Sequence, residues 1–196
     1  MRELSLHILD VVENGITAGA GCIAIAVEES LAADRLTIRV ADDGRGMPAE
    51  KALRLEDPFV TSRTTRRVGL GLSLLAAAAR RCEGELTVAT TPGRGTEITA
   101  TFRRSHIDRA PLGDIAATLE VLIVGNPQVD FVYSHRVDDG DFTLDTRELR
   151  GDLAGVDLGD PMVAREVTQS IRRALHDMTS AAHSGQGRQP DGEAHD

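Results

Sequence analysis

The sequence is poor in aromatic residues and in long apolar runs, and these shortages exclude several classes of protein. Aromatic residues make up 3% of the 196 residues and tryptophan is absent, which argues against the stacking platforms that bind single-stranded nucleic acids. The formal net charge of -9 at pH 7 also argues against a general nucleic-acid binder. No apolar run approaches the roughly 20 residues needed to span a bilayer. We therefore expect neither a nucleic-acid partner nor a membrane contact.

Cysteine is also scarce, because the chain has only Cys22 and Cys82. The two lie far apart and match no metal-binding spacing, so we expect reduced thiols that are buried or half-buried. The N-terminus lacks a signal-peptide pattern and begins with an amphipathic segment. The sequence therefore predicts a soluble, cytoplasmic protein, and its 41% of hydrophobic residues suffice for a real core.

Apolar periodicity predicts an α-β-β-α-β-β order in the first half of the chain. In the first helix, an apolar stripe lies beside a polar stripe that places Asp10 and Asn14 one turn apart. The short linker between the first two strands favours an antiparallel pair. The expected fold is α+β, a two-layer α/β sandwich whose mostly antiparallel sheet has helices on one face. The helices are expected at 2–18, 48–55 and 69–81, and the strands at 22–28, 36–41, 85–90 and 96–103.

After residue 104 the composition changes, and a small α-β-β-α appendage is predicted. Its helices are expected at 114–124 and from 160 onward, and its hairpin (130–137 and 141–149) should turn at 138–140. Residues 179–196 are rich in Gly, Ser, His and Gln, and we expect disorder there. The predicted division is a domain at 1–104, an appendage at 105–178 that could dock a partner, and a tail at 179–196.

Polar and glycine-rich clusters follow one another in the first half of the chain, and together they predict a nucleotide site. Each cluster alone has an ordinary explanation as a turn, a helix entry or a solvated helix face. Neither the GxGxxG dinucleotide fingerprint nor the Gly-Lys-Ser/Thr of a P-loop is present. The clusters are Asp10 to Asn14 with Ala18-Gly19-Ala20, then Asp42-Asp43-Gly44-Arg45-Gly46-Met47, then Gly69-Leu70-Gly71-Leu72, and then Gly93-Arg94-Gly95-Thr96.

The first two clusters contain groups suited to a base and a cation. Asp42 stands at a strand end, where its carboxylate can accept a hydrogen bond from an exocyclic amine such as adenine N6. Gly44 and Gly46 let the backbone pass close to the base because they carry no Cβ. Asn14 offers a neutral oxygen to Mg²⁺, which usually keeps waters and phosphate oxygens as its other ligands.

The third cluster is suited to phosphates. Gly69 and Gly71 stand at the entry to a helix, where free N–H groups and the helix dipole favour an anion. Arg63, Arg66 and Arg67 lie in the loop just before that helix and can reach phosphate charge.

These motifs resemble those of the GHKL superfamily, which includes DNA gyrase B, Hsp90, the histidine kinases and MutL, and whose fold is the Bergerat ATP-binding fold. The segment from Asp10 to Ala20 is similar to the family's Asn box, and Asp42-Asp43-Gly44-Arg45-Gly46 to its first glycine box. The stretch 57–63 (Asp-Pro-Phe-Val-Thr-Ser-Arg) resembles the Pro-Phe-x-Thr-Thr-Lys stretch of many histidine kinases. The second glycine box is matched at 69–73 and the late Gly-Thr pair at 95–96. The resemblance covers about residues 3–103.

The resemblance implies ATP and Mg²⁺ as cofactors and a role for each matched position. Asn14 would hold Mg²⁺, and Asp42 would bind the adenine amino group with Thr96 assisting through water. The second glycine box would contact the phosphates, and the 57–68 loop would form a short lid. The implied nucleotide-binding residues are Asn14, Asp42, Gly44, Gly46, Met47, Thr61, Arg63, Gly69, Leu70, Gly71, Leu72 and Thr96.

The sequence departs from the family pattern in three places. Asp10 stands where ATP-hydrolysing members carry Glu, so it is a candidate general base with a shorter reach. Arg63 replaces a common Lys and keeps the charge with a different shape. No upstream two-helix hairpin that could carry a phosphoacceptor His is expected, and His7 is expected to be a pocket-edge or packing residue rather than a phosphoacceptor. The other histidines show no ligand spacing, and we expect surface or tail positions for them.

The leading hypothesis is an ATP–Mg²⁺-binding regulatory or signalling subunit that acts with an unidentified partner protein. One alternative is an enzyme, either a slow ATPase that uses Asp10 as its base or a protein kinase that phosphorylates a partner in trans. A further alternative is a nucleotide-binding accessory subunit of a larger enzyme complex. A homodimer is compatible with the sequence, which names neither partner nor pathway.

Overall fold

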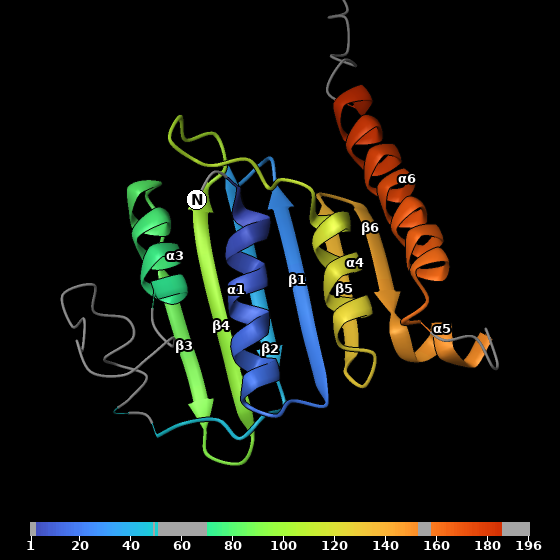
Figure 1. Cartoon of the computed structure of the whole chain (residues 1–196). Coiled ribbons are helices and arrows are strands. Elements are labelled where there is room, and N and C mark those ends of the chain that lie inside the picture. Colours follow the sequence, from blue (N-terminus) through green and yellow to red (C-terminus); the bar gives the residue numbers. More distant parts are fainter. Residues whose placement is uncertain (1–2, 49, 51–69, 153–157, 186–196) are drawn as a thin grey trace, which may run out of the picture.

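The computed structural model describes residues 3–48, 50, 70–152 and 158–185 (Figure 1). The helices are α1 (Leu4–Thr17), α3 (Leu70–Arg81), α4 (Ile115–Gly125), α5 (Thr146–Asp152) and α6 (Pro161–Gly185). The strands are β1 (Cys22–Ser30), β2 (Arg35–Asp42), β3 (Leu86–Thr91), β4 (Gly95–Arg103), β5 (Asp130–Val137) and β6 (Gly140–Asp145).

The described strands form one six-stranded sheet in the order β3-β4-β2-β1-β5-β6. Strands β1 and β5 run parallel, and every other neighbouring pair is antiparallel. Helices α1, α3 and α4 lie side by side on one face of the sheet (Figure 1). This arrangement confirms the predicted α+β class, with a mostly antiparallel sheet and helices on one face.

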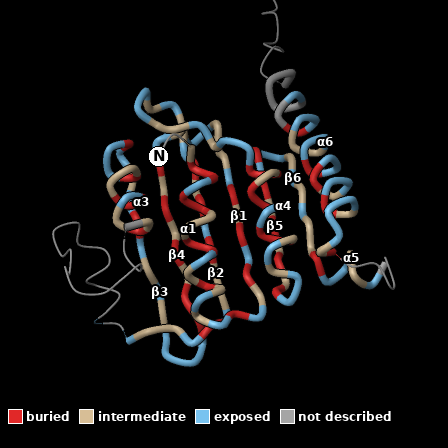
Figure 2. Tube along the Cα trace, viewed as in Figure 1, coloured by how far each residue is buried: buried red, intermediate tan, exposed pale blue. Residues whose placement is uncertain are grey.

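The core lies between the helix layer and the sheet. The apolar stripe of α1 is buried, with Leu4, Ile8 and Val12 at most 1% exposed. In β1, inward residues such as Ile23 and Ile25 alternate with exposed or half-buried residues on the far face. Buried residues accordingly run along α1 and the central strands (Figure 2). The periodicity of the sequence therefore predicted the inward faces correctly.

The elements of the first half lie within a few residues of their predicted bounds, and β1 and β2 form the expected antiparallel pair. The helix predicted at 48–55 lies almost entirely outside the described residues. The two cysteines are free, and Cys82 is buried while Cys22 is half-buried, as expected.

The segment that follows residue 104 extends the same sheet. Strand β5 pairs in parallel with β1, from Cys22 opposite Asp130 to Glu29 opposite Val137. Helix α4 packs against α1 and α6. The predicted boundary at 104 and the docking role of the appendage stay predictions, but the sheet is continuous across that boundary.

Two predictions for this segment were wrong. The second strand of the hairpin ends at Asp145 rather than at 149, and α5 begins at Thr146. The Asp145 carboxylate accepts a hydrogen bond from the Arg147 N–H at 2.9 Å, and Glu148 follows three residues after Asp145, which is a helix-start signature. Helix α6 continues to Gly185, seven residues into the predicted disordered tail. Ala181 and Ala182 favour helix there.

The expectation of a surface position was also wrong for His135. This residue is 3% exposed and its Nδ1 lies 2.8 Å from the hydroxyl of Tyr133, which is fully buried. Its Nε2 lies 3.5 Å from Glu29 Oε1, and Glu29 Oε2 accepts a hydrogen bond from Arg104 at 3.0 Å. Every second residue of β5 faces the helix layer, and this alternation carries His135 inward with Phe131 and Tyr133.

Candidate functional site

Three polar side chains form a row across the ends of β3, β4 and β2. In the sheet register Thr96 of β4 lies opposite both Thr90 of β3 and Asp42 of β2. Two residues further along these strands, Ile98 and Val40 are buried under the helices. Since strand side chains alternate between faces, the row lies on the helix-covered face. The sheet pairing therefore brings together Asp42 and Thr96, both predicted for the site.

Thr90 connects this row to the glycine-rich turn. Its Oγ1 accepts a hydrogen bond from the Met47 N–H at 3.0 Å and lies 3.4 Å from the Met47 carbonyl oxygen. The same atom lies 3.1 Å from the Gly95 carbonyl oxygen and 3.1 Å from Thr96 Oγ1. One hydroxyl thus holds the end of the turn against the β3–β4 hairpin.

The turn after β2 has glycines because the backbone of neighbouring segments passes close by. A Cβ on Gly44 would lie 3.0 Å from the Ala18 Cβ. Gly46 has a φ of +59°, and a Cβ there would collide with the Thr91 carbonyl. Asp42 Oδ1 accepts a hydrogen bond from the Gly44 N–H at 2.9 Å, which folds the turn back toward the site.

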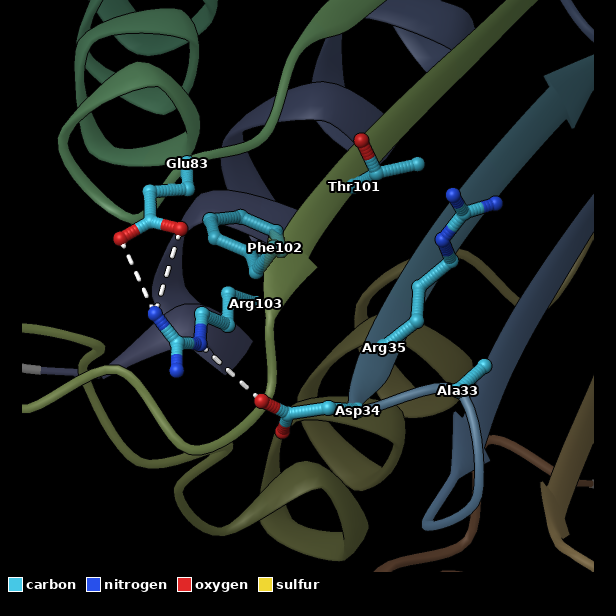
Figure 3. A pocket seen from close by; sticks show the side chains of 7 residues that line it. All are labelled: Ala33, Asp34, Arg35, Glu83, Thr101, Phe102 and Arg103. Carbon is cyan, nitrogen blue, oxygen red and sulfur yellow. Dashed lines mark hydrogen bonds and ion pairs between the residues drawn. The ribbon is translucent and has the colours of Figure 1, made fainter.

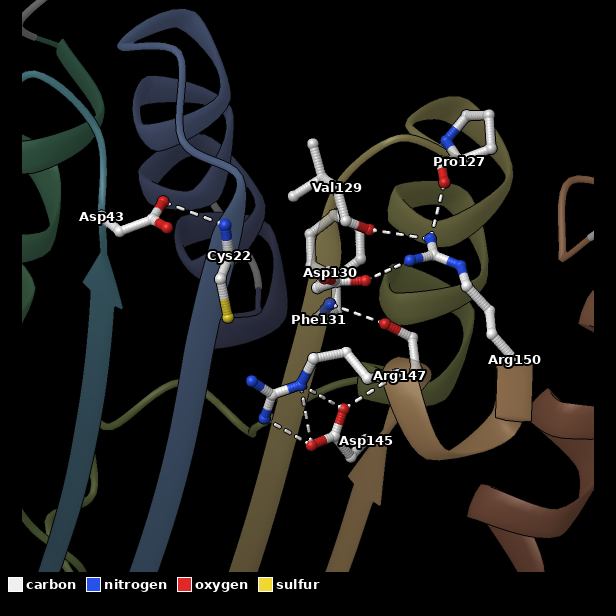
Figure 4. Close-up of polar contacts among 10 residues, drawn as sticks. Cys22, Asp43, Pro127, Val129, Asp130, Phe131, Asp145, Arg147 and Arg150 are labelled. Atoms are coloured by element: carbon white, nitrogen blue, oxygen red, sulfur yellow. Dashed lines mark hydrogen bonds and ion pairs between the residues drawn. The ribbon is translucent and has the colours of Figure 1, made fainter. Parts of the chain in front are cut away.

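Asp43 ties the same turn to the segment that follows α1. Its Oδ1 accepts hydrogen bonds from the Gly21 N–H at 2.7 Å and the Cys22 N–H at 2.9 Å; the bond to Cys22 is drawn in Figure 4. The Arg45 N–H donates to the Ala18 carbonyl at 3.1 Å. The two adjacent aspartates therefore have separate roles, since Asp42 belongs to the row and Asp43 anchors the start of β1.

Further charged pairs at the ends of β5 and β6 hold α5 in place (Figure 4). Arg150 forms an ion pair with Asp130 and donates to the Pro127 carbonyl at 2.6 Å. Arg147 pairs with Asp145 at 2.6 Å. Each arginine is thus paired with an aspartate, and the pairs connect α5 to the ends of β5 and β6.

Helix α1 passes over Asp42. A Cβ on Gly15 would lie 3.0 Å from the Asp42 Cβ, so only a glycine allows this approach without a shift. Asp10 and Asn14 are half-buried on the same helix, one turn apart. A Cβ on Gly71 would lie 2.9 Å from the Asp10 Cβ, so the start of α3 rests against Asp10. Helix α1 thus contacts Asp42 through Gly15, next to Asn14, and the start of α3 through Asp10.

Burial affects the ionisable groups near the site. It raises the pKa of the Asp42 carboxyl above its ordinary value, while N–H groups of Gly44 and Thr96 oppose that shift. His7 is 4% exposed, and burial lowers its pKa. Its Nδ1 has no hydrogen-bond partner among the described residues. His7 is therefore a neutral packing residue at neutral pH, in line with its predicted role.

The other predicted positions divide into two groups. Thr61, Arg63 and Gly69 lie outside the described residues, as does the expected lid at 57–68. Leu70 and Gly71 open α3, and Leu72 is 4% exposed in the core.

The sequence-based interpretation missed Thr90, Gly15 and the anchoring role of Asp43. The predicted hairpin register, which places residue 90 across from the Gly-Thr pair, could have pointed to Thr90.

Two surface hollows lie at opposite ends of the sheet. The one of about 270 Å³ is lined by the row residues, by others from β2, β3 and β4 such as Ala41, Ala89 and Glu97, and by Arg94 of the β3–β4 turn. The one of about 360 Å³ contains none of the predicted site residues (Figure 3). Its Arg103 guanidinium is engaged by Asp34 at 3.0 Å and Glu83 at 3.2 Å. Of the predicted site residues, only Asp42 and Thr96 line the smaller hollow.

Comparison with known families agrees with this geometry. Residues 2–106 match the family of histidine kinase-, DNA gyrase B- and HSP90-like ATPases. The chain belongs to this family. Membership implies nucleotide binding, and it supports ATP binding by a histidine-kinase-like domain of the kind found in signalling kinases. The matched range ends just after β4 and contains the whole row and both aspartates of the turn.

The similar proteins are much longer than the matched region. The chain is 34% identical over 103 residues to the sensor histidine kinase RcsC of Escherichia coli, which covers 50% of this chain and 11% of that protein. It is 40% identical over 108 residues to the sensor protein kinase FleS of Pseudomonas aeruginosa, covering 55% of this chain and 26% of that protein. The chain thus spans about a tenth to a quarter of these relatives.

Among solved structures, the chain is similar to the Aquifex aeolicus MutL ATPase domain complexed with ADP. The TM-score is 0.46 at 14% identity, and the likeness covers 69% of this chain and 60% of that one. In the ranges that the structure describes, no helix combines the length and the apolar character of a bilayer span.

Proposed function

We propose that this chain binds ATP with Mg²⁺ and acts as a regulatory or signalling subunit whose state a partner protein recognises. The observation that carries the proposal is the close approach of Gly15 to Asp42, which sets the helix that bears Asn14 over the carboxylate at the end of β2. In this arrangement an acceptor for a base amine and an oxygen for a cation come from adjacent elements.

The base end of the site would be Asp42 with Thr96. The Asp42 carboxylate is half-buried, and its Oδ1 is already oriented by the Gly44 N–H. A preorganised acceptor gains more from an exocyclic amine than one that must be ordered on binding. Gly46 and Met47 follow in a turn that Thr90 holds in place.

The phosphate end would be the start of α3. Free N–H groups at a helix N-terminus favour anions, and Gly71 keeps this end close to α1. Asn14 is the residue that would hold Mg²⁺, together with phosphate oxygens and water. The described residues contain no group of three or more His, Cys, Asp or Glu side chains placed to hold a metal. When bound, the ion would neutralise phosphate charge.

The test of ATP binding is calorimetry on the full chain with ATP and Mg²⁺. Asp42→Asn should weaken binding by about tenfold or more, because the charged acceptor of the amine is lost. Asp141→Asn, on the exposed start of β6, is the matched control and should bind like the wild type. A wild-type chain without affinity for ATP–Mg²⁺ would end the proposal.

One contact favours hydrolysis as a second function. The Asp10 Oδ2 would lie 3.1 Å from a Cβ on Gly71, so the carboxylate stands at the start of the helix proposed to bind phosphate. A base at that position could accept a proton from water attacking the terminal phosphate. Asp10→Asn should then abolish slow phosphate release while ATP binding persists. Phosphate release that survives the substitution would exclude Asp10 as the base.

Two relatives are a sensor histidine kinase and a sensor protein kinase, so phosphate transfer to a partner in trans is a further activity to test. Incubation with γ-labelled ATP and co-purified proteins distinguishes the cases. Label on a partner supports a kinase. Tight ATP binding with neither release nor transfer supports the regulatory role.

A further inference from the structure

Thr90 lies outside the set of residues that the family resemblance assigns to the nucleotide, yet it is the most connected hydroxyl at the site. Four polar atoms surround its Oγ1: the Met47 N–H, two carbonyl oxygens and Thr96 Oγ1. A hydroxyl has one hydrogen to donate and two lone pairs to accept with. This count identifies the arrangement in which the most hydrogen bonds form.

The largest number of these hydrogen bonds forms when Thr90 donates its hydrogen to a carbonyl oxygen, because Thr90 then also accepts from both other partners. The Gly95 carbonyl at 3.1 Å and the Met47 carbonyl at 3.4 Å can only accept, and the closer one is the better partner. The Met47 N–H can only donate, and it takes one lone pair of Thr90. The contact of 3.1 Å with Thr96 then forms only if Thr96 donates its hydrogen to Thr90.

Thr96 is left without a hydrogen for any other partner. Its Oγ1 keeps two lone pairs, so toward a ligand it can act only as an acceptor. The carboxylate of Asp42, its neighbour across β2 and β4, also only accepts. Every side-chain group of the row that faces the base end therefore accepts hydrogen bonds.

We propose that Thr90 is a positioning residue for base discrimination, because it holds the Thr96 hydroxyl as an acceptor that selects a base bearing an amino group over one bearing a carbonyl. This inference rests on the proposed function, since it takes the row to be the base end of the site. A 6-amino purine offers donors directly to the row. A 6-oxo purine offers an oxygen, which would face lone pairs with no hydrogen between them.

The experiment compares ATP and GTP affinities by calorimetry with Mg²⁺ on the full chain. Two matched pairs at position 90 differ by the hydroxyl: Thr against Thr90→Val, and Thr90→Ser against Thr90→Ala. The ratio of ATP to GTP affinity should fall about tenfold on loss of the hydroxyl in each pair, because Thr96 is then free to donate to the 6-oxo group. Thr90→Ser should keep the wild-type ratio. If the valine variant fails to fold, the serine and alanine pair alone gives the test.

A second arm asks whether Thr90 acts through Thr96. In a Thr96→Val background, loss of the Thr90 hydroxyl should leave the ratio unchanged, since no hydroxyl remains to be oriented. A purely structural role would lower both affinities by the same factor and leave the ratio constant, and that result overturns the inference. A ratio that still changes in the Thr96→Val background overturns it as well. If the wild type prefers ATP but the ratio of ATP to GTP affinity does not depend on the Thr90 hydroxyl, only this inference fails. If the wild type binds neither nucleotide, the proposed function fails as well.

Discussion

Gly71 of α3 and Asp10 of α1 are so close that a Cβ on the glycine would lie 2.9 Å from the Cβ of the aspartate. This contact sets the distance between the two helices at the end proposed to bind phosphate. The aspartate Cβ is attached to the helix backbone and cannot swing aside, so an added methyl group must displace α3. The spacing of the two elements therefore depends on the absence of a side chain at one position.

The first prediction is that Gly71→Ala weakens ATP binding. A glycine-to-alanine change inside a helix usually stabilises it by roughly 0.5–1 kcal/mol, but here the methyl group would push the start of α3 away from α1. We expect affinity for ATP–Mg²⁺ to fall at least several-fold by calorimetry.

The control for this prediction is Gly151→Ala in α5, where an added Cβ meets no atom within 4 Å. That variant should keep its ATP affinity. Equal affinities of the Gly71 variant and the wild type would show that the contact does not set the phosphate end.

The second prediction concerns Glu29, whose carboxylate lies between His135 and Arg104. The nearby His135, whose Nε2 lies 3.5 Å from the carboxylate, is the main reason that the pKa of Glu29 is lowered from 4.5, and Arg104 adds to this. A lowered folded-state pKa stabilises the fold above the unfolded value, and the gain is lost as pH falls below about 4.5. Glu29→Gln should lower the free energy of unfolding by about 1–3 kcal/mol at neutral pH, and by less at about pH 3.

Urea unfolding at both pH values measures this difference. Glu28→Gln is the matched control, because Glu28 is exposed on the far face of the same strand. A deficit in the Glu29 variant that stays constant with pH would show that the charge of Glu29 is not what stabilises the network.

The third prediction is that Tyr133→Phe destabilises the fold although the ring is kept. The hydroxyl of Tyr133 is the partner of His135 Nδ1, and both side chains are buried. Burial also raises the pKa of Tyr133, so the phenol stays neutral across the ordinary pH range. Removing the oxygen leaves a buried ring nitrogen without its partner, which costs about 1–3 kcal/mol.

Thermal and urea unfolding report this loss. Because Tyr133, His135 and Glu29 form one network, the double variant Tyr133→Phe/Glu29→Gln should lose less than the sum of the two single losses. Strictly additive losses would indicate that the contacts act independently.

The fourth prediction concerns Asp114, which caps α4 and reaches α6. Its carboxylate accepts a hydrogen bond from the Ala117 N–H at 2.9 Å and another from Arg172 at 2.8 Å. Asp114→Ala should lower the free energy of unfolding by about 1 kcal/mol through the lost cap. Asp114→Asn keeps a capping oxygen and should recover most of that loss. If asparagine and alanine are equally destabilising, the ion pair with Arg172 rather than the cap carries the effect.

The sequence by itself predicted the elements of the first half, because helix and strand periodicity are local properties of the chain. The family resemblance, which rests on the order of the motifs along the chain, also implied that Asp42 and Thr96 act together. The errors at 146–149 and 179–185 arose where a capping pattern and a continuing helical composition were overlooked.

Only the tertiary structure decided which distant segments meet. The parallel pairing of β5 with β1, the burial of His135 beside Glu29, and the contact of Asp10 with Gly71 all join residues far apart in the sequence. No local pattern encodes such partners, because they depend on how the sheet orders its strands and on how closely helices approach. The direction of the Thr96 hydroxyl follows from the same source, since it depends on four atoms that two segments, the turn at Met47 and the start of β4, bring around Thr90.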